Sequence, residues 1–238
     1  MQDASLGYGG AALFQGLDFT LTGGAWTCLL GTSGVGKSTL LRLIAGLERP
    51  ERGTIRCSDG QPLAGRLAWM GQRDDLLPWL PARANVMLGA RLRGDPPDPA
   101  RAESLLERVG LTPQRDQLPA TLSGGQRQRV ALARTLMEDR PVVLMDEPFS
   151  ALDAITRARL QSLAAALLAG RTVLLVTHDP LEALRLGHRV HIMAGQPARL
   201  EPPILPAGDP PRDLHDPALM RLQGDLLARL ADAQDVAA

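Results

Sequence analysis

The chain has 238 residues, and its 26 Lys and Arg side chains balance its 26 Asp and Glu to a formal net charge of zero. A chain of this length can bury a full hydrophobic core, and it fits one large α/β domain with a smaller insertion better than two equal domains. Zero net charge argues against charge-driven binding of nucleic acid, so we expect no nucleic-acid partner. No stretch approaches the ~20 apolar residues that span a bilayer, and the N-terminus lacks a signal-peptide pattern, which predicts a cytoplasmic protein.

Two strands are predicted near the N-terminus. Residues 17–21 alternate apolar and polar side chains, which is typical of a half-buried strand. Residues 25–30 form a short apolar run that leads directly into a glycine-rich segment. This run contains Cys28, which shows no metal-ligand spacing with Cys57, and we expect it to be a small core residue.

The glycine-rich segment, residues 31–38, reads Gly-Thr-Ser-Gly-Val-Gly-Lys-Ser and fits the pattern G-x-x-x-x-G-K-[ST]. In this pattern backbone N–H groups wrap a phosphate chain, and the final hydroxyl binds Mg²⁺. Lys37 is the only lysine of a chain that otherwise uses arginine. A slim ammonium can reach between two phosphates, a position that suits the broad guanidinium fork poorly. The segment therefore predicts a nucleotide-binding protein.

Helical patterns follow the glycine-rich segment. The first has apolar residues at Leu40, Leu41, Leu43, Ile44 and Leu47, so strand, glycine loop and helix occur in the order that a phosphate loop requires. Residues 76–138 combine prolines with helical spacing and predict a helical insertion. Its clearest helix has Asp98 as N-cap, Pro99 at the first position and Gly110 as stop. The apolar face of that helix comprises Ala102, Leu105, Leu106 and Val109.

Two further apolar strands are predicted at residues 142–145 and 172–176. The first is followed by Asp146 and Glu147, and the second by Thr177 and His178. Ligands of an open parallel sheet bind beyond the carboxyl ends of its strands. We therefore expect these side chains and Lys37 to meet at one edge of the sheet.

The C-terminal region changes composition after Gly195, where the chain becomes proline-rich. Asp216 and Pro217 then open a predicted short amphipathic helix. Its apolar face is expected to hold Leu219, Leu222, Leu226, Leu227 and Leu230. Such a pattern predicts a terminal helix that packs on the body of the protein.

Residues 122–126, Leu-Ser-Gly-Gly-Gln, predict a second anion site. Ser123 and Gln126 have the spacing of a capping box at a helix start. The segment could be a simple turn before a helix, but its two glycines leave backbone N–H groups facing outward, as in an anion site. A chain with one phosphate loop would use a second anion site for the nucleotide of another subunit.

These motifs, in this order and spacing, closely resemble the ATP-binding subunit of ABC (ATP-binding cassette) transporters over essentially the whole chain. The resemblance implies a phosphate-loop (P-loop) NTPase core with a mainly parallel sheet, an N-terminal antiparallel β subdomain and an inserted α-helical subdomain. Within a single domain over residues 1–238, we expect the nucleotide-binding core at 1–75 and 139–200. The helical signature subdomain would occupy 76–138, and a proline-rich tail with a C-terminal helix would occupy 201–238.

The resemblance also implies the site residues of a Mg-ATP enzyme. The catalytic residues would be Glu147 as the base, His178 on the γ-phosphate, Lys37 and Gln72. Mg²⁺ would be held by Ser38, Gln72 and Asp146. Nucleotide contacts are expected from Gly31, Thr32, Ser33, Gly34, Val35, Gly36, Lys37, Ser38 and Thr39, and from Ser123, Gly124, Gly125, Gln126 and Asp153. Tyr8 matches the aromatic residue that stacks on adenine, although a plain surface tyrosine is the alternative.

Three classes of ABC protein compete. Long coiled-coil insertions, zinc cysteines, a second cassette or a basic surface would indicate a soluble ATPase of DNA repair or translation, and the sequence has none. Residues 73–79, 84–86 and 211–217 resemble importer ATPases for nitrate, aliphatic sulfonates, taurine and thiamine precursors. The ATPase of a separate-subunit exporter or of a lipid or lipoprotein extraction system remains the alternative.

The importer assignment implies partners outside this chain. We expect a second copy of the chain, separate permease subunits in the membrane and, indirectly, a substrate-binding protein. The chain would then lie peripherally on the cytoplasmic face of the inner membrane, and its partner subunits would select the substrate. Trp79 lies between prolines and is predicted to anchor a permease helix, with burial inside the helical subdomain as the alternative.

Overall fold

The computed structural model describes residues 1–235 and contains two compact units. One unit comprises Met1–Leu67 and the chain from Gly170 onward, and the other comprises Ala68–Ala169. The boundaries expected at residues 75, 138 and 200 follow the sequence motifs. The two units are instead defined by the contacts within each unit, so the two divisions differ. The expected tail, 201–238, extends three residues past the described part of the chain.

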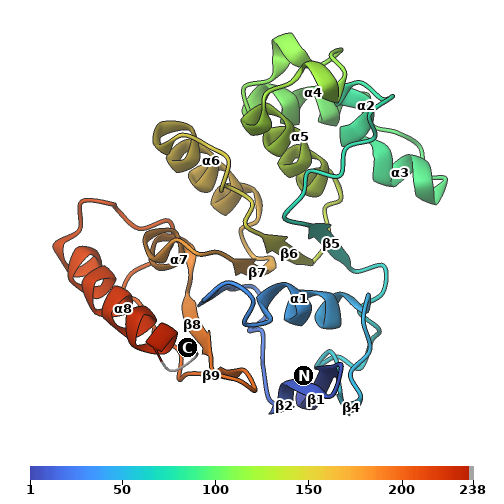
Figure 1. Cartoon of the computed structure of the whole chain (residues 1–238). Coiled ribbons are helices and arrows are strands. Elements are labelled where there is room, and N and C mark those ends of the chain that lie inside the picture. Colours follow the sequence, from blue (N-terminus) through green and yellow to red (C-terminus); the bar gives the residue numbers. More distant parts are fainter. Residues whose placement is uncertain (236–238) are drawn as a thin grey trace. The chain divides into compact units, whose positions relative to one another are not determined.

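The first unit carries the strand and helix that flank the glycine-rich segment (Figure 1). Its elements, in chain order, are β1 (Gln2–Tyr8), β2 (Ala11–Leu17), β3 (Trp26–Gly31), α1 (Lys37–Ala45), β4 (Arg52–Thr54), β7 (Thr172–Val176), α7 (Pro180–Leu186), β8 (Arg189–Ala194), β9 (Arg199–Leu200) and α8 (Pro217–Asp235).

Strand β3 lies between β7 and β8 and runs parallel to both. Its register pairs Leu29 with Val176 on one side and Cys28 with Val190 on the other. β9 adds to β8 in the antiparallel sense. The side chain of Cys28 is fully buried, as expected for a strand covered on both faces. A separate antiparallel sheet has the order β2-β1-β4.

The second unit is mainly helical. Its elements are β5 (Leu67–Met70), α2 (Ala82–Val86), α3 (Leu88–Arg93), α4 (Pro99–Arg108), the 3₁₀ turns η1 (Thr112–Gln114) and η2 (Pro119–Thr121), α5 (Gly124–Met137), β6 (Val142–Asp146) and α6 (Ala154–Leu167). β5 and β6 are hydrogen-bonded neighbours. The strands predicted at residues 142–145 and 172–176 are therefore confirmed as β6 and β7.

Helix α4 confirms the most detailed sequence prediction. The carboxylate of Asp98 accepts a hydrogen bond of 2.9 Å from the Arg101 N–H, and Pro99 occupies the first helical position. Gly110 follows the helix with φ 71°, in the left-handed region where glycine is unstrained. The four residues of the predicted apolar face, Ala102, Leu105, Leu106 and Val109, are all buried. Local capping and spacing thus determine this helix.

The strand predicted at residues 17–21 is wrong. β2 ends at Leu17, and residues 18–22 form neither strand nor helix. The alternation does report burial, because Phe19 is buried while Asp18 and Thr20 are exposed. The backbone of Phe19 exchanges hydrogen bonds with Met1. An extended segment that is buried on one side therefore has the alternating pattern of a strand, although residues 18–22 do not pair in a sheet.

Two apolar faces also need correction. Helix α1 stops at Ala45, so Leu47 lies beyond its C-cap and is 68% exposed. Helix α8 is 19 residues long rather than short, and Leu227 is half exposed. Leu219 and Leu226, two turns apart, are buried, and α8 packs against α7 and β8 (Figure 1). In residues 1–235, no helix has the length and apolar character needed to cross a bilayer.

Candidate nucleotide-binding site

The glycine-rich loop lies in the first unit, between the end of β3 at Gly31 and the start of α1 at Lys37. Gly36 has φ 105°, and a Cβ at this position would lie 2.9 Å from the ring of Phe14. Only glycine therefore allows this close approach of the loop to β2. Gly36 is also the N-cap of α1 and has no side chain that could cap the helix. The first N–H groups of α1 thus remain suited to an anionic ligand.

The side chain of Lys37 folds back on this loop. Its Nζ donates hydrogen bonds of 2.8 Å to the Gly31 carbonyl and 2.7 Å to the Thr32 carbonyl. Only 9% of Lys37 is exposed. The two carbonyl contacts hold the ammonium against the loop that the sequence assigns to the phosphates. Ser38 and Thr39 follow in the first turn of α1 and are half-buried.

His178 and the phosphate loop come to one edge of the sheet in the first unit. β3 and β7 are parallel and adjacent, and the Thr177 N–H donates 3.2 Å to the Leu29 carbonyl. Both strands therefore end at the same edge, with Gly31 at one end and the exposed His178 after the other. This part of the expected convergence is confirmed. Asp146 and Glu147 belong to the other unit, and their approach to this edge stays a prediction.

Tyr8 ends β1 with 53% of its surface exposed. Its hydroxyl donates to the carboxylate of Glu48, and this hydrogen bond raises the pKa of Tyr8 above its ordinary value. An exposed ring leaves a face on which a base could stack. Both expectations for Tyr8, adenine contact and plain surface residue, therefore stay open.

The second unit holds the two acidic residues at the carboxyl end of β6. Asp146, the last residue of the strand, is 5% exposed. Glu147 has φ 51°, which is uncommon and strained for a residue with a Cβ. Its carbonyl accepts hydrogen bonds of 3.0 Å from Gln128 Nε2 and 3.0 Å from Ser150 Oγ. These two bonds hold the strained backbone at the position predicted for the catalytic base.

Gln128 is a residue that the sequence patterns did not single out. It is 8% exposed and lies on α5, two residues after the signature glutamine. Its side-chain oxygen accepts from the Ala151 N–H at 2.9 Å, in addition to the contact with Glu147. In the sequence, only its position near the start of the helix that follows the signature could have pointed to Gln128. The side chain fastens α5 to the turn at residues 147–151.

The signature segment forms the predicted capping box. Ser123 Oγ accepts from the Gln126 N–H at 3.2 Å, and Gln126 Oε1 accepts from the Ser123 N–H at 2.7 Å. The Ser123 hydroxyl proton and the Gln126 amide group remain available as donors. Gly124 is exposed, and a Cβ there would meet its nearest atom only at 4.0 Å. Exposed donors at a helix start suit an anion.

Gln72 is exposed and lies on a cleft of about 390 Å³ in the second unit. The cleft also borders Gly124, Gln128 and Ser150, so the signature start and the turn after Glu147 share it. Asp153 lies nearby in sequence as the N-cap of α6, where it accepts 3.0 Å from the Thr156 N–H. This hydrogen bond lowers the pKa of the Asp153 carboxyl. The nucleotide contact expected of Asp153 is thus additional to a capping role.

A glycine loop between a buried parallel strand and a helix without a side-chain cap defines a phosphate-loop nucleotide-binding protein. Comparison with known proteins gives the family, since residues 14–150 match the family model described as "ABC transporter". The chain belongs to the ABC transporter family and is one of its ATP-binding, ATP-hydrolysing cassettes.

Relatives extend this likeness over nearly the whole chain. An uncharacterised ABC transporter ATP-binding protein of Haemophilus influenzae is 47% identical, over 98% of this chain and 99% of the relative. The aliphatic sulfonates import ATP-binding protein SsuB of Rhodopseudomonas palustris is 42% identical, over 96% of this chain and 81% of the relative. A second protein of that name, from Pseudomonas syringae, is 43% identical over 95% and 93%.

Solved structures agree with the sequence relatives. A dimeric cassette, MJ0796, in a post-hydrolysis state bound to ADP and Pi, has a TM-score of 0.77 and 27% identity. The match covers 87% of this chain and 98% of that protein. The fold class predicted from the sequence, a P-loop NTPase with antiparallel and helical additions, is confirmed by this likeness.

Proposed function

We propose that this chain is the ATP-hydrolysing subunit of an importer and that it works as a dimer on separate permease subunits. Full-length similarity to sulfonate-import ATPases, at 42–43% identity, is the observation that carries the importer assignment. The subunit would lie on the cytoplasmic face of the membrane. This subunit would contact the nucleotide and the permease but not the transported substrate. The permease and the binding protein would therefore select the substrate.

ATP is the substrate that the phosphate loop fits. Gly36 keeps the loop free of a Cβ, and the first turn of α1 offers N–H donors to phosphate oxygens. Lys37 supplies the single ammonium, and residues 31–39 form the rest of the cradle. Tyr8 would stack on the adenine ring through its exposed face.

Mg²⁺ would be held by the Ser38 hydroxyl, the Gln72 side chain and the Asp146 carboxylate. In residues 1–235 no group of three or more His, Cys, Asp or Glu could hold a metal ion unaided. This donor set fits Mg²⁺, which binds through one or two carboxylates together with phosphate oxygens and water. Held by these residues, Mg²⁺ would supply positive charge that offsets the negative charge developing on the phosphate.

Glu147 is the proposed general base. A carboxylate at this position can orient an attacking water and accept its proton. Gln128 and Ser150 donate hydrogen bonds to its backbone carbonyl, so the Glu147 side chain extends from a backbone that is held in place. His178, at the carboxyl end of β7, is proposed to contact the γ-phosphate and to report its presence.

The signature residues Ser123, Gly124, Gly125 and Gln126, with Asp153, are proposed to act on the nucleotide of the other protomer. Ser123 and Gly124 are exposed at the start of α5, and the dimeric state of a related cassette supports this arrangement. Each of the two sites would then combine one phosphate loop with the signature of the partner protomer.

Permease contact is proposed at Trp79. Its exposed fraction of 69% rules out the alternative that Trp79 is buried in the helical subdomain. A large exposed aromatic next to prolines is a costly feature on a surface that binds nothing, and aromatic anchors dominate many interfaces. The separate permease subunits are thus the partner that this surface fits.

Transport direction tests the proposal against the exporter alternative. The subunit, assembled with its permease in liposomes so that it faces outward, is given external ATP. An importer moves substrate, delivered by the binding protein inside the vesicle, outward to the side of the ATPase. Movement into the vesicle lumen would instead establish an exporter, and the Glu147→Gln subunit provides the baseline without hydrolysis.

A further inference from the structure

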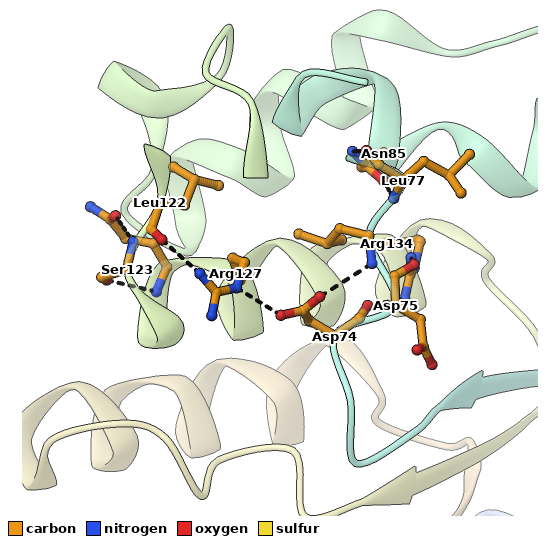
Figure 2. A network of polar contacts seen from close by, with 10 residues as sticks. Asp74, Asp75, Leu77, Asn85, Leu122, Ser123, Arg127 and Arg134 are labelled. Carbon is orange, nitrogen blue, oxygen red and sulfur yellow. Dashed lines mark hydrogen bonds and ion pairs between the residues drawn. The ribbon is translucent and has the colours of Figure 1, made fainter. Parts of the chain in front are cut away.

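A chain of polar contacts in the second unit joins residues 72–79, here called the glutamine segment, to residues 122–126, the signature loop (Figure 2). Arg127, in the first turn of α5, is its centre. Its Nε donates to Asp74 Oδ2 at 2.9 Å, and its Nη1 donates to the Leu122 carbonyl at 2.8 Å. One guanidinium therefore bridges the two segments, which lie about fifty residues apart in the sequence.

Arg134, two turns further along α5, holds the backbone of the same segment. It donates to the carbonyls of Asp74 at 2.7 Å and Asp75 at 2.8 Å (Figure 2). Asp75 has φ 44°, a left-handed conformation that is unfavourable for most residues with a Cβ. Burial lowers the pKa of Arg134, against the opposing effect of Asp75 and Asp74. The fork of Arg134 thus keeps a strained turn in place.

A third contact fixes the segment beyond this turn. The fully buried Asn85 accepts from the Leu77 N–H at 2.8 Å and donates to the carbonyls of Leu77 and Leu80. Asn85 lies on α2, which packs against α5. Three side chains, all on helices α2 and α5, therefore hold the glutamine segment to the helix that carries the signature.

The geometry points to Asp74 and Arg127 as a positioning pair that couples the glutamine segment to the signature loop. The pair does not contact the reacting atoms. It sets the orientation of the Leu122 carbonyl, directly before Ser123, according to where Asp74 lies. A displacement of Gln72 or Trp79 would then reach the signature donors through this pair. The contacts of Arg127 with Asp74 and Leu122 are present in the structure. Their effect on the partner's nucleotide rests on the proposed function.

Bridging requires a guanidinium. Arginine presents several donors in a rigid fork, whereas a lysine ammonium is a point charge on a flexible stem. Lysine at position 127 could retain attraction to Asp74 but would not hold the Leu122 carbonyl in the same geometry. Asparagine at position 74 keeps the size of the side chain and removes the charge. Asp75→Asn is the matched control, because Asp75 is exposed and joins the network through its backbone carbonyl.

The first experiment is amide hydrogen exchange on the isolated subunit without nucleotide. Asp74→Asn and Arg127→Lys should each speed exchange at residues 123–127 by roughly fivefold, the size expected for a partly exposed charged pair. Asp75→Asn should leave this exchange unchanged. The double variant should be no worse than either single variant, since the two changes break one contact. Equal behaviour of Asp74→Asn and Asp75→Asn, or additive losses, would overturn the pair.

The second experiment measures ATP-driven dimerisation with Glu147→Gln as background. That background must dimerise with Mg-ATP, and its failure would count against the proposed function rather than against the pair. Asp74→Asn should weaken dimerisation roughly fivefold, as for the exchange, while the affinity of the monomer for a fluorescent ATP analogue stays unchanged. Asp74→Glu, which can still accept from Arg127, should restore dimerisation. Normal dimerisation of Asp74→Asn at a lower melting temperature would reduce the pair to a purely structural contact.

Discussion

The side-chain amide of Gln128 donates a hydrogen bond of 3.0 Å to the backbone carbonyl of Glu147. The contact joins the first turns of α5 to a residue whose φ of 51° is strained. Since Gln128 also accepts from the Ala151 N–H, one buried side chain fixes both ends of this turn. The proposed base is therefore positioned by the signature helix itself.

Replacing Gln128 should misplace the base. Gln128→Ala removes the donor to Glu147 and the acceptor for Ala151, and we expect kcat to fall by roughly tenfold with KM for ATP little changed. Lost hydrogen bonds of a buried group should also lower the free energy of unfolding by about 1–3 kcal/mol. Steady-state ATPase assays and denaturant titration measure the two effects. Gln161→Ala, at another buried glutamine of the same unit, should destabilise the protein without changing kcat.

Glu147→Gln should stop hydrolysis and keep ATP binding. The change removes the proton acceptor while preserving shape, and loss of general-base catalysis costs at least ~10²-fold in rate. The expected product is a stable ATP-bound dimer, measured by size-exclusion chromatography with multi-angle light scattering. A variant that hydrolyses ATP normally and stays monomeric under saturating Mg-ATP would exclude Glu147 as the base.

Lys37→Arg should fail although it preserves charge. The ammonium is buried against two loop carbonyls, and a guanidinium is too broad for the same position. We expect at least a roughly tenfold loss of ATP affinity or turnover, measured by titration with a fluorescent nucleotide and by phosphate release. Arg42→Lys, an exchange on the exposed side of the same helix, is the control and should be neutral. Normal turnover of Lys37→Arg with the permease present would contradict the assigned role.

Mixed dimers test whether the sites are shared between protomers. One protomer carries Lys37→Ala and the other carries Ser123→Ala, so a shared arrangement puts both lesions in one site and leaves the other intact. The expected result is one occluded ATP per dimer, counted after rapid removal of free nucleotide. Two equally impaired sites would indicate that each protomer uses its own signature.

Trp79→Ala should weaken assembly with the permease and leave the isolated subunit intact. Because 69% of Trp79 is exposed, its removal costs little packing, and the melting temperature and ATP affinity should not change. An aromatic hot spot is worth about 2 kcal/mol or more, so permease association should weaken at least ~30-fold in a pull-down titration. Leu205→Ala, at an exposed leucine of the other unit, should have no such effect. A large loss of stability without an assembly defect would place the docking surface elsewhere.

The sequence alone determined the features that depend on neighbouring residues. The cap of α4 at Asp98, the capping box of Ser123 and Gln126, and the order of strand, glycine loop and helix around Lys37 were all predicted and found. The two caps rest on hydrogen bonds between residues three positions apart, and the order of strand, loop and helix lies in one continuous segment, so a short window of sequence contains each signal. The motifs that resemble the ABC family are likewise short continuous stretches of sequence.

Only the tertiary structure decided what joins distant segments. It showed that residues 18–22 are extended without a ladder, that Trp79 is exposed, and that Arg127 reaches Asp74. Single-sequence patterns report which side chains prefer burial, but not which partner covers them or which carbonyl an arginine fork meets. Those choices depend on the packing of α5 against segments brought together by the fold, which no local spacing encodes.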